Sequence, residues 1–176
     1  MYDFKTMNKE HYKGYQATFT YETKYYYDVI VNDMGFNLVL KEFESLVSKS
    51  FVDTLFEDFL VHPHAIGIFN GEELVGFAEG NYEAWHQSYR ITNIFVEKKY
   101  RRQGYGELLM NELMSRANKM HDLRAFVLET QSCNYPAISF YKKMGFSLIG
   151  LDTIAYTNSD VKNKEVRLEF GKKKLT

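Results

Sequence analysis

The segment NIFVEKKYRRQGYGELLM, residues 93–110, constrains the fold more than any other part of this chain. An apolar, strand-like run gives way to four cations within five residues, then to two glycines, and then to leucines at helical spacing. A second strand-like run, RAFVLET, follows at 124–130. Strand, helix and strand in this order over 89–130 predict two parallel strands joined by a right-handed crossover.

Other segments favour antiparallel neighbours. The apolar runs 65–69 and 73–82 flank Asn70-Gly71, a pair typical of tight hairpins. We expect one or two strands over 17–31, a strand over 89–97, and strands over 146–156 and 165–170. Helices are predicted over 104–119, over 135–144 and, with an acidic face, over 51–60, where Pro63 would end the helix. The class is therefore α/β or α+β, with a mixed sheet.

Length and charge limit the function classes. The 176 residues have a mass of 20.7 kDa and a net charge of −1, so we expect one domain over 1–176 and no overall field that attracts nucleic acid or a membrane. The single cysteine, Cys133, excludes an internal disulfide and a cysteine-based zinc site. His62 and His64 have no further ligand near them in the sequence, so no metal is expected. The lack of a leader-like or membrane-spanning apolar run predicts a cytoplasmic protein.

The basic loop has the chemistry of an anion site. Gly104 and Gly106 let an anion approach the backbone, and the first N–H groups of the following helix point towards it. Arg101 and Arg102 can add charge-assisted contacts. The third glycine of a dinucleotide fingerprint is replaced by Leu109, and a Walker A lysine–serine pair is absent. The alternative is a charged turn with no ligand.

Two motifs together resemble a known family. Arg101-x-x-Gly104-x-Gly106, at the start of a helix, is similar to the R/Q-x-x-G-x-G/A signature of the GNAT family of N-acetyltransferases. The segment NYPAISFYKKMGF, residues 134–146, resembles the second motif of that family. The two motifs cover roughly residues 65–150. The resemblance implies a mixed, mostly antiparallel sheet with a central pair of splayed parallel strands, flanked by helices.

The resemblance also implies roles for individual residues, with acetyl-CoA as co-substrate. Backbone groups of the strand would pair with its pantetheine arm, the loop and helix start would bind its pyrophosphate, and Asn134 would contact it further on. Tyr141 would be the general acid that protonates the departing thiolate; the alternative for Tyr141 is a packing role in the core. The implied cofactor-binding residues are Ile94, Phe95, Val96, Arg101, Arg102, Gln103, Gly104, Tyr105, Gly106, Glu107, Asn134 and Tyr141.

The C-terminal half resembles the streptothricin acetyltransferases within this family. The similar segments are LETQ (128–131), FYKKMGF (140–146), GLDTIAY (150–156) and EVRLEF (165–170). The resemblance implies direct acetyl transfer to a primary amine of a small cationic molecule, such as a streptothricin-type antibiotic, and hence antibiotic resistance.

An alkyl ammonium acceptor needs a group that removes its proton, and a carboxylate is expected. Many relatives carry an acidic residue on the strand before the glycine loop, where this chain has Thr92 and Asn93. The base must therefore lie elsewhere, or solvent must take the proton. We predict Glu129 as the base and Glu83 as the second choice. The other candidates are Glu79, Asp53 and Glu57, and a solvated or structurally paired role is the alternative for each.

Two other functions stay open. The chain could acetylate another amine, such as a polyamine, an amino acid, an aminoglycoside or a protein N-terminus, or it could bind acetyl-CoA without turnover. An exposed strand near the C-terminus could mediate a homodimer.

Overall fold

The computed structural model describes residues 2–174, which form two compact units. Within that range the first unit comprises residues 2–19, 52–127 and 173–174, and the second comprises residues 20–51 and 128–172. Each unit is described by itself.

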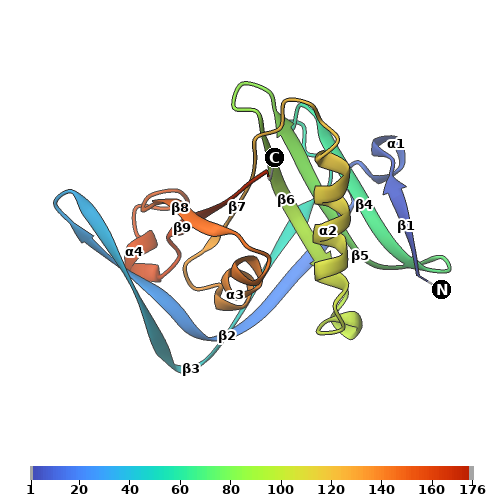
Figure 1. The fold of residues 1–176 in the computed structure, drawn as a ribbon. Helices are drawn as coiled ribbons and strands as arrows, with labels where there is room; N and C mark the ends of the chain where they lie inside the picture. Colours follow the sequence, from blue (N-terminus) through green and yellow to red (C-terminus); the bar gives the residue numbers. More distant parts are fainter. Residues whose placement is uncertain (1, 175–176) are drawn as a thin grey trace. The chain divides into compact units, whose positions relative to one another are not determined.

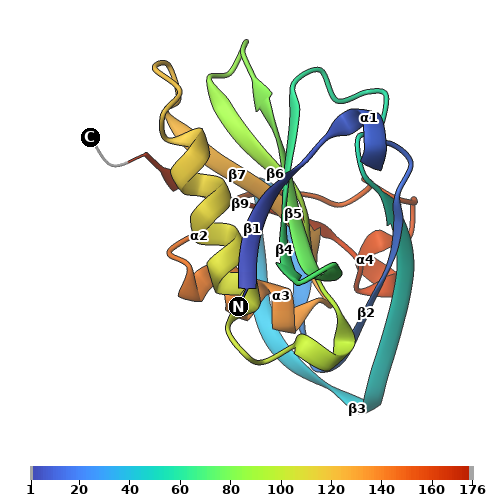
Figure 2. The same cartoon turned by 90° about the vertical axis from the view of Figure 1, so that its right-hand side faces the viewer.

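The first unit is a sheet covered by one long helix. Strands β1 (Tyr2–Met7), β4 (Pro63–Asn70), β5 (Glu73–Glu83) and β6 (Ser88–Val96) are successive antiparallel neighbours. The start of β7 (Ala125–Gln131) pairs in parallel with β6, with Ser88 opposite Ala125 and Arg90 opposite Val127. Helix α2 (Tyr105–Ala117) packs along β4, β5 and β6 (Figure 1), and a short helix α1 (Lys9–Tyr12) follows β1 (Figure 2).

The core of this unit explains why α2 lies where it does. Leu109, Met110 and Leu113 recur at helical spacing and are fully buried. A separate cluster centres on the stacked rings of Phe77 and Phe95, whose centroids are 5.2 Å apart. Phe95 is therefore a core side chain, and its backbone lies opposite Phe77 of β5, so it is not open to the pantetheine arm that it was predicted to bind.

The second unit contains a long hairpin and the C-terminal strands. Strands β2 (Gln16–Asn32) and β3 (Gly35–Thr54) form a two-stranded sheet, whose first and last residues reach into the first unit. The end of β7 is followed in the sheet by β9 (Arg167–Lys173) and β8 (Ser147–Asp152), the last two antiparallel. Helices α3 (Tyr135–Lys143) and α4 (Asp160–Asn163) complete it.

Most predicted elements are confirmed, including the mixed, mostly antiparallel sheet and the parallel pair β6–β7. The Asn70-Gly71 hairpin forms as expected, with Gly71 at φ +64°. The ends of α3 also agree, because Asn134 caps its start and Gly145, at φ +83°, follows its last turn.

The predicted helix over 51–60 is wrong. Residues 51–54 finish β3, and the following residues make turns before β4. Phe56 has φ +60°, which no right-handed helix contains, and its N–H donates to the buried Glu79 carboxylate (2.7 Å). Phe59, one of the apolar residues at helical spacing in this segment, is 77% exposed. A long-range hydrogen bond therefore overrides the helical spacing, and Asp53 and Glu57 do not share an acidic helix face.

Candidate functional site

The basic loop between β6 and α2 has a defined backbone conformation. A short 3₁₀ helix, η1 (Lys98–Tyr100), leads to Arg102 at φ +61° and to Gly104 at φ +89°. Gly104 is the N-cap of α2, and the first intrahelical bond runs from Leu108 N–H to the Gly104 carbonyl oxygen (3.1 Å). The backbone N–H groups of residues 105–107 come before that bond, so they have no acceptor within the helix, and they lie at the positive end of the helix dipole. This geometry suits a phosphate group.

The four cations of the loop are not equivalent. Lys99 forms an ion pair with Glu73, which also accepts a hydrogen bond from the Tyr100 hydroxyl (2.9 Å). These partners, Lys99 first, hold the pKa of Glu73 below its usual value. Lys98 and Arg102 are exposed, and within residues 2–174 neither side chain forms an ion pair. The charge available to an anion in solution is therefore carried by these two residues.

Arg101 lies against the strand that precedes the loop. Its Nε donates to the carbonyl oxygen of Val96 (2.8 Å), and the side chain is half-buried. The N–H of Glu97 donates to the Val75 carbonyl oxygen on β5 (2.9 Å). Because successive residues of a strand direct their backbone groups to opposite sides, those of Ile94 and Val96 point away from β5. The backbone groups of Ile94 and Val96 that are predicted to pair with pantetheine thus face away from β5. The Val96 carbonyl oxygen, however, already accepts the hydrogen bond from Arg101.

Asn134, Tyr141 and Glu129 all belong to the second unit. The Asn134 side chain accepts a hydrogen bond from the Ala137 N–H (3.2 Å), so its oxygen caps α3. Its predicted contact with the cofactor must therefore share that oxygen or use the amide nitrogen.

Tyr141 is half-buried among aromatic rings. The centroids of Phe140, Phe146 and Phe170 lie 5.6, 6.4 and 6.2 Å from the Tyr141 centroid. Burial raises the pKa of Tyr141 to about 12. The phenol is therefore protonated at neutral pH, which is the state that a general acid requires.

Glu129 is exposed on β7 and faces a cation shared with two other carboxylates. Its carboxylate lies 3.8 Å from Arg167 Nε, and the Arg167 guanidinium is also 3.4 Å from Asp152 and 3.6 Å from Glu169. Three carboxylates around one guanidinium leave a local excess of negative charge.

Glu83 is held at the end of the β5–β6 hairpin. Its carboxylate accepts from Arg90 Nε (2.8 Å) and from the Ser88 hydroxyl (3.0 Å), so both oxygens have partners. Ser88 is six residues before Ile94 on the same strand, which is about 20 Å along an extended chain. The structure therefore does not bring Glu83 close to the glycine loop.

Glu79 is the most deeply buried carboxylate beside β6. It accepts hydrogen bonds from Phe56 N–H (2.7 Å), the Thr92 hydroxyl (2.9 Å) and the Asn93 amide (3.2 Å), and it is fully buried. Burial raises its pKa, and the nearby Asp53 raises it further. Thr92 and Asn93 thus bind a carboxylate from the neighbouring strand. A lone glutamate inside the apolar run LVGFAEG was the available signal for this arrangement.

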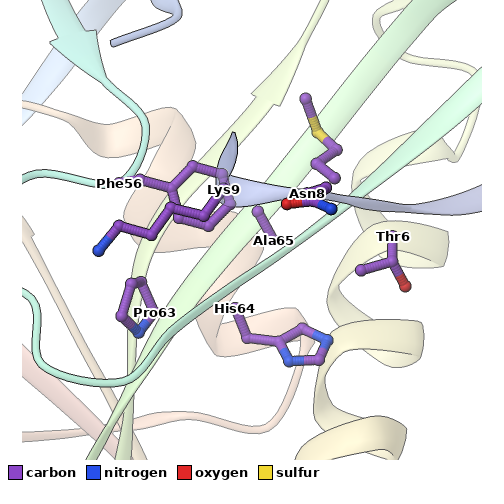
Figure 3. Close-up of a pocket in the computed structure, with 8 residues that line it drawn as sticks. Thr6, Asn8, Lys9, Phe56, Pro63, His64 and Ala65 are labelled. Atoms are coloured by element: carbon purple, nitrogen blue, oxygen red, sulfur yellow. The ribbon is translucent and has the colours of Figure 1, made fainter. Parts of the chain in front are cut away.

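A cavity of about 420 Å³ lies elsewhere in the first unit, among Thr6, Met7, Asn8, Lys9, Phe56, Pro63, His64 and Ala65 (Figure 3). Burial lowers the pKa of His64, so its imidazole is neutral at pH 7. The lining contains no carboxylate, so this cavity does not suit a cationic acceptor. No motif in the sequence indicates this cavity.

Two negative findings complete the description. In the part of the chain that the structure describes, no three His, Cys, Asp or Glu side chains are grouped so that they could hold a metal ion. Within residues 2–174, no helix combines the length and apolar character needed to cross a bilayer.

Comparison with known sequences identifies the relatives of this chain. Residues 32–146 match the model of the acetyltransferase (GNAT) family. A streptothricin acetyltransferase of Escherichia coli is 33% identical over 140 residues, 78% of this chain and 77% of that protein. One from Streptomyces lavendulae is 37% identical over 84 residues, 48% of this chain and 44% of that protein. The catalytic subunit of the N-terminal acetyltransferase B complex of Arabidopsis thaliana is 30% identical over 105 residues, 53% of this chain and 59% of that protein.

Solved structures give a similar result. A nourseothricin acetyltransferase has a TM-score of 0.77 and 26% identity, covering 98% of both chains. A Bacillus anthracis protein described as a streptothricin acetyltransferase, in complex with acetyl coenzyme A, has a TM-score of 0.74 and 17% identity over 99% of this chain and 98% of that one. An aminoglycoside 6′-N-acetyltransferase in complex with coenzyme A has a TM-score of 0.57 and 16% identity and covers 66% of this chain and 75% of that one.

The family match spans well over half of the chain, and it includes both motifs, the glycine loop before α2 and the segment around α3. The chain therefore belongs to the GNAT family of acetyltransferases.

Proposed function

We propose that the whole chain, residues 1–176, works as one acetyltransferase domain that moves the acetyl group of acetyl-CoA to a primary amine of a small cationic molecule. A streptothricin-type antibiotic is the proposed acceptor, and resistance to it the biological role. The cytoplasm is the proposed location, since a single unpaired cysteine, Cys133, suits a reducing compartment.

One observation carries the choice of acceptor. The nourseothricin acetyltransferase and the Bacillus anthracis protein described as a streptothricin acetyltransferase match 98% or more of this chain, whereas the aminoglycoside enzyme matches 66%. A third of the chain is therefore shared with the first group and not with the second. Because one fold can host many functions and the site decides among them, the additional shared segments favour the acceptor of the first group.

The residues of the glycine loop fit the cofactor. Gly104 at positive φ opens the start of α2 to an anion, and the exposed Arg102 supplies unpaired positive charge. Ile94 and Val96 present backbone groups that an extended amide chain can pair with. Bound acetyl-CoA supplies an activated acetyl group as a thioester. Asn134 is a further proposed contact.

Two side chains are proposed to move protons. The Tyr141 hydroxyl is protonated at neutral pH and would give its proton to the departing thiolate. Glu129 is favoured over Glu83 as the base, because Glu129 is exposed and lies 3.8 Å from Arg167, whereas Glu83 is held at the end of the β5–β6 hairpin, away from the glycine loop.

A protein N-terminus is the second candidate acceptor. The similarity to the Arabidopsis N-terminal acetyltransferase subunit favours it, although that match covers only 53% of this chain.

The deciding experiment measures release of the coenzyme A thiol from acetyl-CoA in parallel reactions with streptothricin, spermidine, an aminoglycoside and a peptide with a free N-terminus. We expect turnover that saturates with streptothricin, and a product one acetyl group heavier by mass spectrometry. Turnover with the peptide alone would select the second candidate. If acetyl-CoA binds but no amine is acetylated, the chain is a non-catalytic binding domain.

A further inference from the structure

The cavity in the first unit has a fixed apolar floor. Met7, Phe56 and Ala65 line it, and none of these side chains is more than 2% exposed. The backbone of Phe56 is held in place as well, because its N–H donates to the buried Glu79 carboxylate (2.7 Å). Sites for small molecules are usually preformed, mostly apolar hollows of about 300–1,000 Å³. At about 420 Å³, this cavity has the size and the floor of such a site.

His64 lines the cavity with a ring nitrogen that has no partner (Figure 3). Its Nε2 atom is buried, and no hydrogen bond to it is found among the described residues. Burial first, and then the charge of Arg116, lower the pKa of His64, so the ring is neutral at pH 7. A neutral imidazole nitrogen donates or accepts according to its tautomer, and a ligand hydroxyl group can match either. A buried nitrogen without a partner costs stability, so it points to a group from outside the fold.

The other polar groups of the lining offer hydrogens rather than acceptor oxygens. The Thr6 hydroxyl oxygen accepts from Arg116 (2.8 Å). The Asn8 side-chain oxygen accepts from the Glu10 N–H (2.9 Å). In the part of the chain that the structure describes, the Thr6 hydroxyl hydrogen and the Asn8 NH₂ group have no acceptor. A ligand must therefore supply acceptor atoms, and an anion supplies them best.

Lys9, on α1, supplies positive charge. Across residues 2–174, its ammonium group forms no ion pair or hydrogen bond. The pKa of Asp58 is lowered mainly by the hydrogen bond from Lys13 (2.6 Å) and only last by the charge of Lys9. Asp58 is thus already paired, and Lys9 is available to an anionic ligand. Figure 3 shows the Lys9 ammonium and the His64 ring at opposite ends of the lining.

We propose that this cavity binds a small aromatic acid with a hydroxyl group at the end opposite its carboxylate. The carboxylate accepts from the Lys9 ammonium, the aromatic ring packs on Phe56 and Pro63, and the hydroxyl group pairs with His64 Nε2. None of the lining residues belongs to the glycine loop or to the side chains proposed to move protons. The proposal therefore goes beyond acetyl transfer and does not depend on it.

The first test is a titration with 4-hydroxyphenylacetate, followed by NMR of protein that contains ¹⁵N-labelled histidine. We expect the His64 ring signals, identified by their absence in His64→Phe, to shift and saturate with a Kd of about 1 mM or tighter. Tyramine has the same ring and hydroxyl group but carries an ammonium, so it should bind at least about tenfold more weakly. Phenylacetate lacks only the hydroxyl group and should bind about threefold to tenfold more weakly.

Lys9→Met tests the charge. It keeps the apolar stem and removes the ammonium, so it should weaken binding of 4-hydroxyphenylacetate about tenfold in the same titration. Lys5→Met is the matched control, because Lys5 is an exposed lysine of β1 that does not line the cavity. It should leave the Kd unchanged.

His64→Phe separates a binding role from a structural one. Phenylalanine keeps an aromatic ring in place and removes the unpaired nitrogen. If that nitrogen serves a ligand, Tm should stay equal or rise while binding of 4-hydroxyphenylacetate weakens about threefold to tenfold. His121→Phe is the control, because the His121 side chain is fully exposed, and it should keep the Kd of the unaltered protein.

Several results would overturn the proposal. They are His64 signals that do not shift at about 10 mM 4-hydroxyphenylacetate, tyramine binding as tight as that of the acid, and unchanged affinity in Lys9→Met or His64→Phe. A lower Tm for His64→Phe would assign the nitrogen to the fold instead. Saturating acetyl-CoA should leave the Kd unchanged, and competition would place the acid in the transfer site. Because no acetyl transfer is measured, failure here is distinct from failure of the proposed function.

Discussion

At the scale of single residues, Glu79 shows how a buried charge can organise its surroundings. Its carboxylate accepts from a turn, Phe56, and from the neighbouring strand, Thr92 and Asn93. All three groups are donors, so only a residue with acceptor oxygens can satisfy them. The same burial that makes these bonds strong also makes the charged form costly, which is why the pKa of Glu79 is raised.

Glu79→Gln should destabilise the protein by about 1–3 kcal/mol at pH 7, because the amide turns an NH₂ group towards donors. The pH dependence has a definite sign. Because the pKa of Glu79 is raised above the ordinary 4.5, the folded state binds more protons than the unfolded state between the two pKa values. The contribution of Glu79 to the free energy of unfolding therefore falls as pH rises through the folded pKa. The advantage of the unaltered protein over the variant should thus be larger at pH 4.5 than at pH 7.5 in urea titrations. An advantage that grows with pH would contradict the raised pKa.

Gly104→Ala tests whether the glycine loop binds acetyl-CoA. An added Cβ meets nothing within 4 Å, so the substitution acts through backbone strain at φ +89°, about 1–2 kcal/mol. If the loop rearranges to relieve that strain, binding must restore the strained conformation at the same cost in free energy. We therefore expect calorimetry to show a fall of about 5–30-fold in acetyl-CoA affinity. Gly14→Ala is the control, since Gly14 has φ +82° and equally open space far from the loop in sequence. Equal acetyl-CoA affinities for the two variants would show that the loop is only a turn.

Tyr141→Phe should lower kcat by about 10²–10⁴-fold with little change in acetyl-CoA affinity, because it removes only the proton donor. The ring contacts with Phe146 and Phe170 stay in place, so stability should hold. Tyr135→Phe, on the same helix, is the control and should keep full turnover. If Tyr141→Phe is equally active, Tyr141 only packs the core.

At the scale of elements, features set by neighbouring residues could be predicted from the sequence, whereas features set by distant residues could not. The α2 start, the Asn70-Gly71 turn and the ends of α3 depend on residues next to one another, so the sequence pattern predicted each of them. The turn at Phe56 depends on Glu79, 23 residues away, and the apolar spacing of 51–60 predicted a helix instead. Strand β1 and the 20-residue β3 are mostly exposed and carry no clear alternation of buried and exposed residues. The glycine loop was predicted from local signals, but the Glu79 contacts could not be.

Asp28 ties the hairpin to a distant element, since it accepts from Lys41 on β3 and from Lys164 after α4 (2.7 Å). These two ammonium groups, Lys164 first, lower its pKa, so its stabilisation is present above the unfolded pKa of about 3.9 and is lost as pH falls through the folded pKa. Asp28→Asn should cost about 1 kcal/mol at pH 7, because Lys41 is half exposed and solvent screens part of the attraction. The cost should shrink at pH 3 in urea titrations. Glu22→Gln, on the same strand, is the control, and equal costs at both pH values would contradict the pairing.

At the scale of the whole molecule, the two units share four strands. The boundary between them falls inside β2, β3, β7 and β9, so each of these strands contributes residues to both units. Melting one unit would release one end of every shared strand from its hydrogen-bonded neighbours. The chain should therefore unfold as a single domain, although its contacts cluster in two groups.

Calorimetry tests this expectation. We expect one thermal transition whose calorimetric and van't Hoff enthalpies agree. Acetyl-CoA at 100 times its Kd should stabilise the folded chain by about 2.7 kcal/mol, which for a chain of this size raises Tm by roughly 5–10 °C. Gly104→Ala should reduce that shift at the same acetyl-CoA concentration, because its affinity is lower. Two transitions, of which acetyl-CoA moves only one, would mean that the units are separate domains and that only one of them binds the cofactor.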